Sequence, residues 1–150
     1  MIGKLVHPDL HHAQVAMIVG KNPFMSNGLD RARELLREFR KSDERKLIVV
    51  DPRRTETADY ADLHLAVKPG RDAWCMAAIL GAIVQSGSLP MDWLAEHANG
   101  YQAVITALEG LPVDEYARFA GLEPEQVREA AQAQGRQNAH TRPPAVPQGQ

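Results

Sequence analysis

The chain has 150 residues, of which 44% are hydrophobic and 24% are charged, a composition that suits one globular domain with its own core. A formal net charge of -2 gives no support to a nucleic-acid or membrane-surface role through bulk charge. The longest apolar run, residues 73–84, is shorter than the roughly 20 residues that span a bilayer. A single cysteine excludes an internal disulfide and fits a reducing compartment, so we expect a cytoplasmic protein.

Two buried strands joined by a helix are predicted in the first third of the chain. Residues 14–19 and 47–50 form apolar runs of the kind found in strands covered on both faces. Between them, apolar residues recur at spacings of three and four over residues 29–39, which predicts an amphipathic helix. Glutamates interleaved with the arginines of this helix indicate a solvated face rather than a nucleic-acid surface. A strand, a helix and a strand in this order imply a parallel pair with a right-handed crossover.

A third strand and an apolar helix are predicted next. Residues 63–67 alternate between apolar and polar or small side chains, and a proline and a glycine end the strand. Asp72 stands directly before an apolar run at residues 73–85, where a carboxylate can cap the first turn of a helix. That helix is apolar nearly all round, so we expect it to be buried between layers or covered by a partner. Cys75 within it is interpreted as a small buried hydrophobic residue.

The last third of the chain predicts a cluster of short helices. The helices are expected at residues 91–97, 101–109, 113–120 and 124–134. Prolines and glycines between them act as start and stop signals. From Gly135 onward the composition leaves nothing to bury, so residues 135–150 are predicted to be a disordered tail behind a domain at residues 1–134. The predicted fold class is therefore α/β, with a parallel-sheet core followed by short helices.

The loops that follow the three strands are the predicted binding site. Ligands of parallel sheets bind outside the carboxyl ends of the strands. The three loops are therefore expected to lie side by side along this edge of the sheet, the strand-end rim. The loop at residues 20–28 could offer backbone N–H groups to a phosphate, although a plain turn explains it equally well. Arg53 and Arg54 follow the second strand, where their guanidinium groups could meet a phosphate. No G-x-G-x-x-G sequence follows the first strand, so an ordinary nicotinamide fingerprint is missing.

Four short motifs stand in order along these loops and strands. They are G-x-N-P at residues 20–23, D-P-R-x-T-x-T-A at 51–58, A-D at 61–62 and P-G-x-D at 69–72. In this order and at this spacing they resemble the molybdopterin oxidoreductase family, which includes formate dehydrogenases, periplasmic-type nitrate reductases and dimethyl sulfoxide reductase. The resemblance covers roughly residues 9–133.

The resemblance implies a Rossmann-like dinucleotide-binding domain that holds the guanosine diphosphate part of a molybdenum bis(molybdopterin guanine dinucleotide) cofactor. The implied cofactor-binding residues are Gly20, Asn22 and Pro23 on the phosphate or pterin side, Asp51, Pro52, Arg53 and Arg54 toward the ribose and diphosphate, and Gly70, Arg71 and Asp72 toward the guanine. Guanine donors suit a carboxylate acceptor. Arg71 stands where the family commonly has threonine or serine. The alternative interpretation is structural: Asp51 and Asp72 terminate a strand and cap a helix, and Arg53 makes an ion pair.

The resemblance also indicates what this chain lacks. One cysteine cannot bind a four-cysteine iron-sulfur cluster, and the family's metal ligand belongs upstream of the D-P-R motif. We therefore expect no iron-sulfur cluster, no metal ligand and no catalytic residue here. The chain is interpreted as a fragment, split-gene subunit or decayed copy of a molybdopterin-dependent oxidoreductase, inactive without the remaining domains or subunits. The alternative is a non-enzymatic interaction or assembly module that keeps the fold and docks through residues 73–84.

Overall fold

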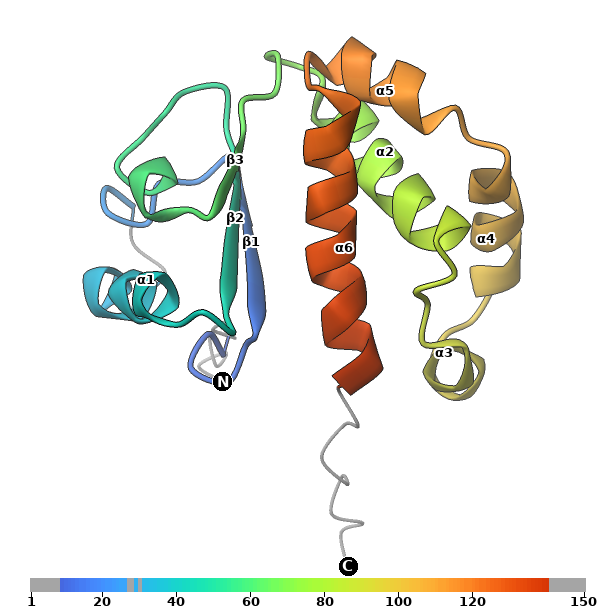
Figure 1. The fold of residues 1–150 in the computed structure, drawn as a ribbon, viewed down its shortest axis with the longest axis horizontal. Coiled ribbons are helices and arrows are strands. Elements are labelled where there is room, and N and C mark those ends of the chain that lie inside the picture. Colours follow the sequence, from blue (N-terminus) through green and yellow to red (C-terminus); the bar gives the residue numbers. More distant parts are fainter. Residues whose placement is uncertain (1–8, 27–28, 30, 141–150) are drawn as a thin grey trace, which may run out of the picture.

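A three-stranded parallel sheet forms the first half of the fold. The structure is a computed structural model, and it describes residues 9–26, 29 and 31–140. The strands β1 (Val15–Val19), β2 (Lys46–Val50) and β3 (Leu63–Leu65) lie in the order β1-β2-β3, and both pairings are parallel. All three strands therefore end at the same edge of the sheet, at the top of Figure 1. This confirms the α/β class and the parallel sheet.

One face of the sheet is covered by α1 (Ala32–Lys41) and the short 3-10 helix η1 (Ala58–Tyr60), on the left in Figure 1. Phe39 and Leu36 of α1 are fully buried, and they pack against Leu47 and Val49 of β2. These helix residues follow the predicted three- and four-residue spacing. The helix starts at Ala32, three residues after the first apolar position of the pattern.

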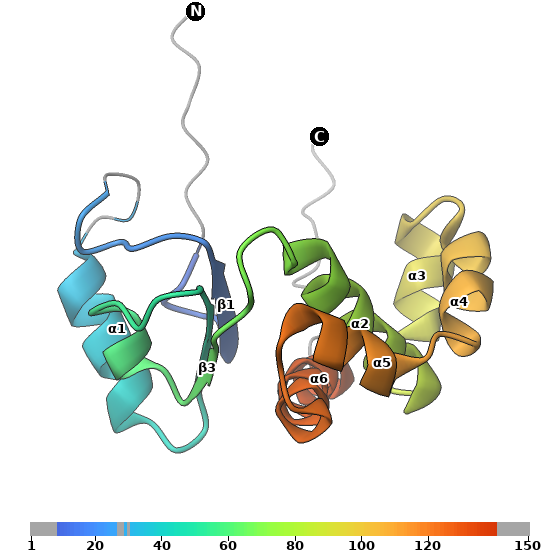
Figure 2. The same ribbon diagram turned by 90° about the horizontal axis from the view of Figure 1, so that it is seen from above.

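The other face is covered by two longer helices, α2 (Asp72–Gln85) and α6 (Pro124–His140). Three shorter helices lie farther from the sheet, as Figures 1 and 2 show: α3 (Met91–His97), α4 (Tyr101–Glu109) and α5 (Val113–Ala120). The apolar helix α2 contacts α4, α5 and α6, and Cys75, Ala78, Ile79, Gly81 and Ile83 on it are buried. Its other residues are only partly covered, and Leu80 is 41% exposed.

Two predicted boundaries are wrong for identifiable reasons. β3 ends at Leu65 instead of residue 67, because the Val67 N–H donates to the Leu65 carbonyl at 2.9 Å and turns the chain. Helix α6 does not stop at residue 134 but continues to His140, so residues 135–140 are not a disordered tail. A Cβ on Gly135 would lie 2.8 Å from the Cβ of Ser88, so this glycine permits close packing and does not end the helix. Residues 141–150 of the predicted tail lie outside the described residues.

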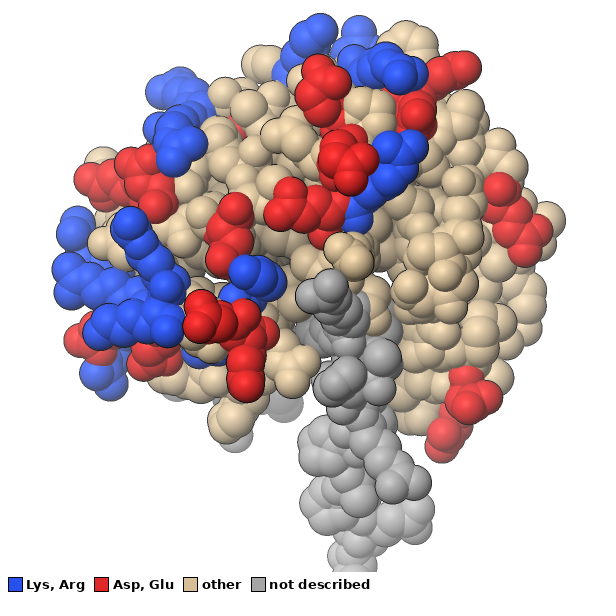
Figure 3. All heavy atoms as spheres, in the orientation of Figure 1, with Lys and Arg blue, Asp and Glu red and all other residues tan. Residues whose placement is uncertain are grey.

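Charge is distributed unevenly between the two halves of the molecule. Residues 21–54 contain ten lysines and arginines and six acidic residues, whereas residues 72–117 contain six acidic residues and no lysine or arginine. In Figure 3 the basic side chains gather on the left, over α1, and the lower right side shows only scattered acidic ones. The sheet half is therefore the more basic half.

Phe39→Ala in the core on the α1 face should cause a large loss of stability. The ring is fully buried and also lies under the Arg45 guanidinium, whose central carbon is 3.8 Å from the ring centroid. Truncation should lower the free energy of unfolding by about 3–5 kcal/mol, as expected for a buried phenylalanine. Urea denaturation measures it, with Phe119→Ala on the half-exposed ring of α5 as the matched control. Equal losses in the two variants would contradict this assignment of the core.

Candidate functional site

The carboxyl ends of the three strands form a rim whose first two loops are tied to neighbouring strands. The Gly20 N–H donates to the Val50 carbonyl at 2.8 Å, and the Asp51 N–H donates to the Leu65 carbonyl at 3.2 Å. Each loop therefore begins at a fixed position against the adjacent strand. Gly20 has φ +58°, a conformation that favours glycine at this point of the rim.

Asn22 connects the first loop to the segment that follows β2. Its Oδ1 accepts hydrogen bonds from the Phe24 N–H at 3.2 Å and from the Thr57 hydroxyl at 2.9 Å. Thr57 is completely buried, and Pro23 beside Asn22 is buried as well. The side chain of Asn22 thus holds two distant segments of the chain together, and Thr57 is a positioning residue absent from the predicted set. The signal for it was present, since Thr57 belongs to the D-P-R-x-T-x-T-A motif.

Asp51 shapes the second loop. Its Oδ1 accepts a hydrogen bond from the Arg53 N–H at 2.8 Å, which closes an Asx turn around Pro52. Its carbonyl lies 2.9 Å from Nε2 of His64 on β3, and the Nε2–H tautomer donates to it. The Asp51 carboxylate therefore already has a structural role, and only its remaining acceptor capacity is available to a ligand.

The two arginines of this loop differ. Arg54 donates from Nε to Asp59 Oδ1 at 2.8 Å, so its charge is paired with a carboxylate on η1. Arg53 is exposed, and within the described part of the chain it makes no ion pair, in contrast to the structural alternative raised by the sequence. Arg53 is thus the cation of this loop that is available to an anion.

Thr55 carries the most unusual polar group of the rim. Its Oγ1 is buried and has no hydrogen-bond partner among the described residues. Buried hydroxyl groups are nearly always hydrogen-bonded, since leaving one unpaired costs free energy. It lies in the D-P-R-x-T-x-T-A segment, two residues from Arg53 and two from Thr57. The atom is shielded from solvent, so a ligand oxygen can reach it only if the surrounding loop moves.

The third segment of the predicted site has different anchors. The Lys68 N–H donates to the Ala120 carbonyl at the end of α5 at 2.8 Å, and Gly70 turns the chain with φ +75°. Arg71 occupies the N-cap position of α2 without a side-chain capping bond, so Asp72 lies in the first helical turn and does not cap it as predicted. Figure 1 places this segment at the same end of the molecule as the strand rim, between β3 and α2.

The ten predicted residues therefore fall into two groups at one end of the fold. Hydrogen bonds join the loops after β1 and β2 through Asn22 and Thr57, while the segment before α2 is joined to the turn between α5 and α6. No hydrogen bond among the described residues links the two groups directly.

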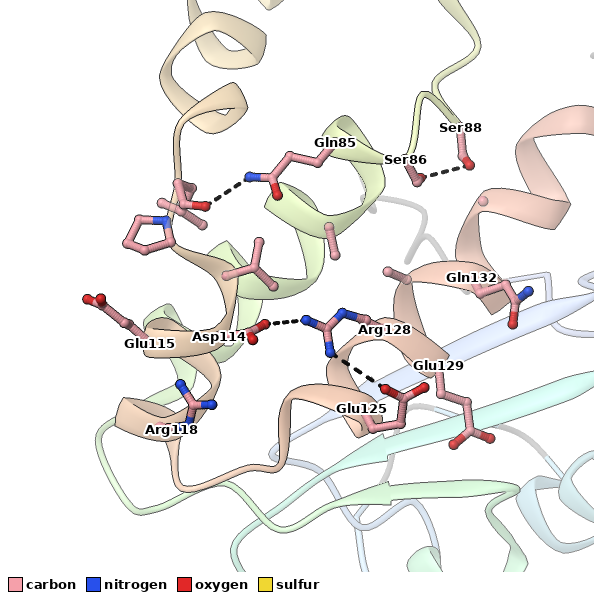
Figure 4. A pocket seen from close by; sticks show the side chains of 16 residues that line it. Gln85, Ser86, Ser88, Asp114, Glu115, Arg118, Glu125, Arg128, Glu129 and Gln132 are labelled. Atoms are coloured by element: carbon pink, nitrogen blue, oxygen red, sulfur yellow. Dashed lines mark hydrogen bonds and ion pairs between the residues drawn. The ribbon is translucent and has the colours of Figure 1, made fainter.

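A hollow in the described surface lies elsewhere, between α2, α5 and α6, and contains none of the ten residues. Figure 4 shows Arg128 held between two carboxylates there, those of Asp114 and Glu125. Gln85 donates from Nε2 to the carbonyl of Leu111 at 2.9 Å. These polar groups are ion-paired or hydrogen-bonded within the protein, so the hollow is interpreted as a packing contact between helices.

Two further features of the described chain bear on function. No group of three or more histidine, cysteine, aspartate or glutamate side chains within residues 9–26, 29 and 31–140 could hold a metal ion. Over the same residues, no helix combines the length and apolar character that a membrane span requires.

Cys75 is completely buried, and its thiol is not a reactive group. Burial raises the pKa of the thiol to about 11, and the negative charge of Asp72 adds to the effect. The thiolate is the reactive form and the metal-binding form of cysteine, so this residue fits the predicted small hydrophobic role.

Replacing Thr57 or Thr55 of the rim with valine should have opposite effects on the free energy of unfolding. Thr57→Val removes the donor to Asn22 and should lower the free energy of unfolding by about 1–3 kcal/mol. Thr55→Val replaces an unpaired hydroxyl with a methyl group and should leave the stability unchanged or raise it. Thermal or urea denaturation of the two variants measures the difference. A loss in Thr55→Val as large as in Thr57→Val would mean that Thr55 has a partner in the free protein.

The raised pKa of Cys75 predicts slow thiol labelling in the native state. Labelling with a chromogenic disulfide at pH 8 should be slow in buffer and fast in urea, because only unfolding exposes the sulfur. Since the folded protein keeps a proton that the unfolded chain releases, the thiol should also lower stability as the pH rises from about 9 toward 11. Rapid stoichiometric labelling without denaturant would contradict this placement of Cys75.

Comparisons of sequence and structure show which known proteins this chain is similar to. Residues 3–92, more than half of the chain, match the sequence pattern of the family described as molybdopterin oxidoreductase. The chain is 33% identical over 131 residues to the F420-dependent formate dehydrogenase 1 subunit alpha of Methanococcus maripaludis, covering 87% of this chain and 19% of that protein. It is 31% identical over 121 residues to a nitrate reductase of Klebsiella oxytoca, covering 81% of this chain and 13% of that protein.

A solved structure supports the fold. Acetylene hydratase from Pelobacter acetylenicus matches with a TM-score of 0.71 and 23% identity, covering 83% of this chain and 17% of that chain. The chain spans less than a fifth of the length of each of these three proteins. Given the family match over more than half of its length, the chain belongs to the molybdopterin oxidoreductase family.

Proposed function

We propose that this chain is a fragment or subunit of a molybdopterin-dependent oxidoreductase and binds the guanine dinucleotide part of the molybdenum cofactor at the strand-end rim. The observation that carries the proposal is the exposed Arg53 guanidinium, which makes no ion pair among the described residues and directly follows the strand-end turn at Asp51. This guanidinium would meet the negative charge of a diphosphate.

The other predicted residues have roles that agree with this proposal. Gly20 and Asn22 keep the first loop in place, and the backbone N–H groups of such a loop favour phosphate oxygens. Asp72 lies in the first turn of α2, and its carboxylate suits the N1–H and N2 amino donors of guanine. Arg71 adds another exposed cation at this end of the fold.

The proposed role is to bind and orient the cofactor, and no residue of the chain is assigned to catalysis. When bound, the molybdenum cofactor supplies two-electron chemistry, and the protein supplies position and electrostatics. A chain with one cysteine cannot hold a four-cysteine cluster. We therefore infer that turnover needs the remaining domains or subunits of a larger enzyme, and we place that assembly in the cytoplasm.

Cofactor analysis of the purified protein tests this proposal. The chain is expressed in cells that make the molybdenum cofactor, and molybdenum, released pterin and released GMP are measured per chain. Stoichiometric pterin and GMP are expected in the native protein. A folded protein that carries neither pterin nor GMP would contradict the proposal.

Three variants show which residues carry the binding. Arg53→Gln and Asp72→Asn should each lower cofactor retention about tenfold or more, because each removes a charged contact. Asp92→Asn on the exposed surface of α3 is the matched control for Asp72→Asn and should retain the cofactor. Circular dichroism and denaturation confirm that each variant is folded. Equal retention in Asp72→Asn and Asp92→Asn would remove Asp72 from the site.

A further inference from the structure

The Asp51 carbonyl lacks the backbone partner that the sheet would normally give it. β2 and β3 pair in parallel with Val50 opposite Leu65, and the Asp51 N–H extends this ladder by donating to the Leu65 carbonyl at 3.2 Å. In a parallel ladder of this register, the Asp51 carbonyl would accept a hydrogen bond from the Val67 N–H. The Val67 N–H donates to the Leu65 carbonyl at 2.9 Å instead. The ladder therefore lacks a backbone donor at the point where the second loop begins.

The His64 side chain supplies the missing donor. Leu63 and Leu65 on either side of it pack in the core cluster shared with α2 and α6, so the alternation of the strand turns His64 toward the face covered by α1. Its Nε2 lies 2.9 Å from the Asp51 carbonyl oxygen, and the residue is half-buried. Because a carbonyl oxygen can only accept a hydrogen bond, the neutral ring carries its proton on Nε2.

This hydrogen bond fixes the residue on which the placement of Arg53 depends. The Asp51 N–H donates to β3, its carbonyl accepts from His64, and its Oδ1 accepts from the Arg53 N–H at 2.8 Å. The bonds to β3 set the direction in which the chain leaves the sheet, and the bond to Oδ1 places the backbone of Arg53. Without His64, the Asp51 carbonyl could turn toward the rim, where the negative end of its dipole would repel a phosphate.

We propose that His64 is a positioning residue for Arg53. It replaces the missing ladder donor and so holds the turn from Asp51 to Arg53 in the geometry that meets a diphosphate. The inference rests on the proposed function, because the diphosphate is the anion that Arg53 would bind there. His64 lies outside the motifs and outside the predicted set of site residues, and it acts on ligand affinity through the loop without touching the ligand.

Titration calorimetry of the full chain with GDP tests the proposal, since GDP carries both guanine and a diphosphate. His64→Leu should weaken GDP binding about threefold to tenfold, which is comparable to the cost of ordering one side chain on binding. His64→Gln, whose side-chain N–H can reach the same carbonyl, should keep the native affinity. In an Arg53→Gln background, His64→Leu should cause no further loss, because both residues act on one contact.

Gln85→Leu is the matched control. Gln85 also donates from its side chain to a backbone carbonyl, that of Leu111 at 2.9 Å, but it lies at the end of α2 that is farther from the rim. Its replacement should lower stability and leave the GDP affinity unchanged. Urea denaturation of every variant separates a loss of folding from a loss of affinity. NMR of the ring nitrogens gives a second test that needs no variant, since the neutral His64 ring should carry its proton on Nε2.

Three outcomes would overturn the proposal. They are a neutral His64 ring with its proton on Nδ1, a GDP affinity that His64→Leu leaves unchanged, and a loss in His64→Leu that is equally large with and without Arg53→Gln. If Arg53→Gln still weakens GDP binding in these cases, this inference fails and the proposed function does not. A native chain that does not bind GDP contradicts both.

Discussion

The burial of β2 on both faces is the constraint on which the rest of the structure depends. Leu47 and Val49 face α1, while Ile48 and Val50 face α2 and α6. A strand covered on both sides leaves no polar position in its buried part, which explains the continuous apolar sequence of residues 47–50. Its two edges pair with β1 and β3, both in parallel. The strand ends, and with them every loop of the candidate site, are brought together as a result.

The rim is held by side chains that serve the loops themselves. Asn22 joins the first loop to Thr57, Asp51 closes a turn with the backbone of Arg53, and His64 contacts the Asp51 carbonyl. A site of this kind is largely formed before its ligand arrives, and preorganisation of this sort lowers the cost of binding. The polar groups that remain available, above all the exposed guanidinium of Arg53, then distinguish the candidate binding atoms from the supporting ones.

Much of this fold could be predicted from the sequence, because strands buried on both faces and an amphipathic helix leave direct patterns in hydrophobicity. The failures arose where tertiary contacts decide the outcome. The last helix was expected to end at residue 134 on composition, but α6 continues to His140, and the missing side chain of Gly135 makes space for Ser88. Asp72 was expected to stand before the helix and cap it, but α2 already begins at Asp72. For the site, motif order indicated the correct loops, but only coordinates reveal that Asn22 and Thr57 are bonded or that Thr55 is unpaired.

The separation of charge between the two halves has a consequence for the rate of ligand capture. A molecule with ten basic residues among residues 21–54 and none between residues 72 and 117 has a permanent electric dipole moment. A polyanion in solution approaches such a dipole preferentially from its basic side, where α1 and the loops after β1 and β2 lie. Added salt screens this field beyond about 8–10 Å, so the encounter rate depends on ionic strength even where the final contacts do not.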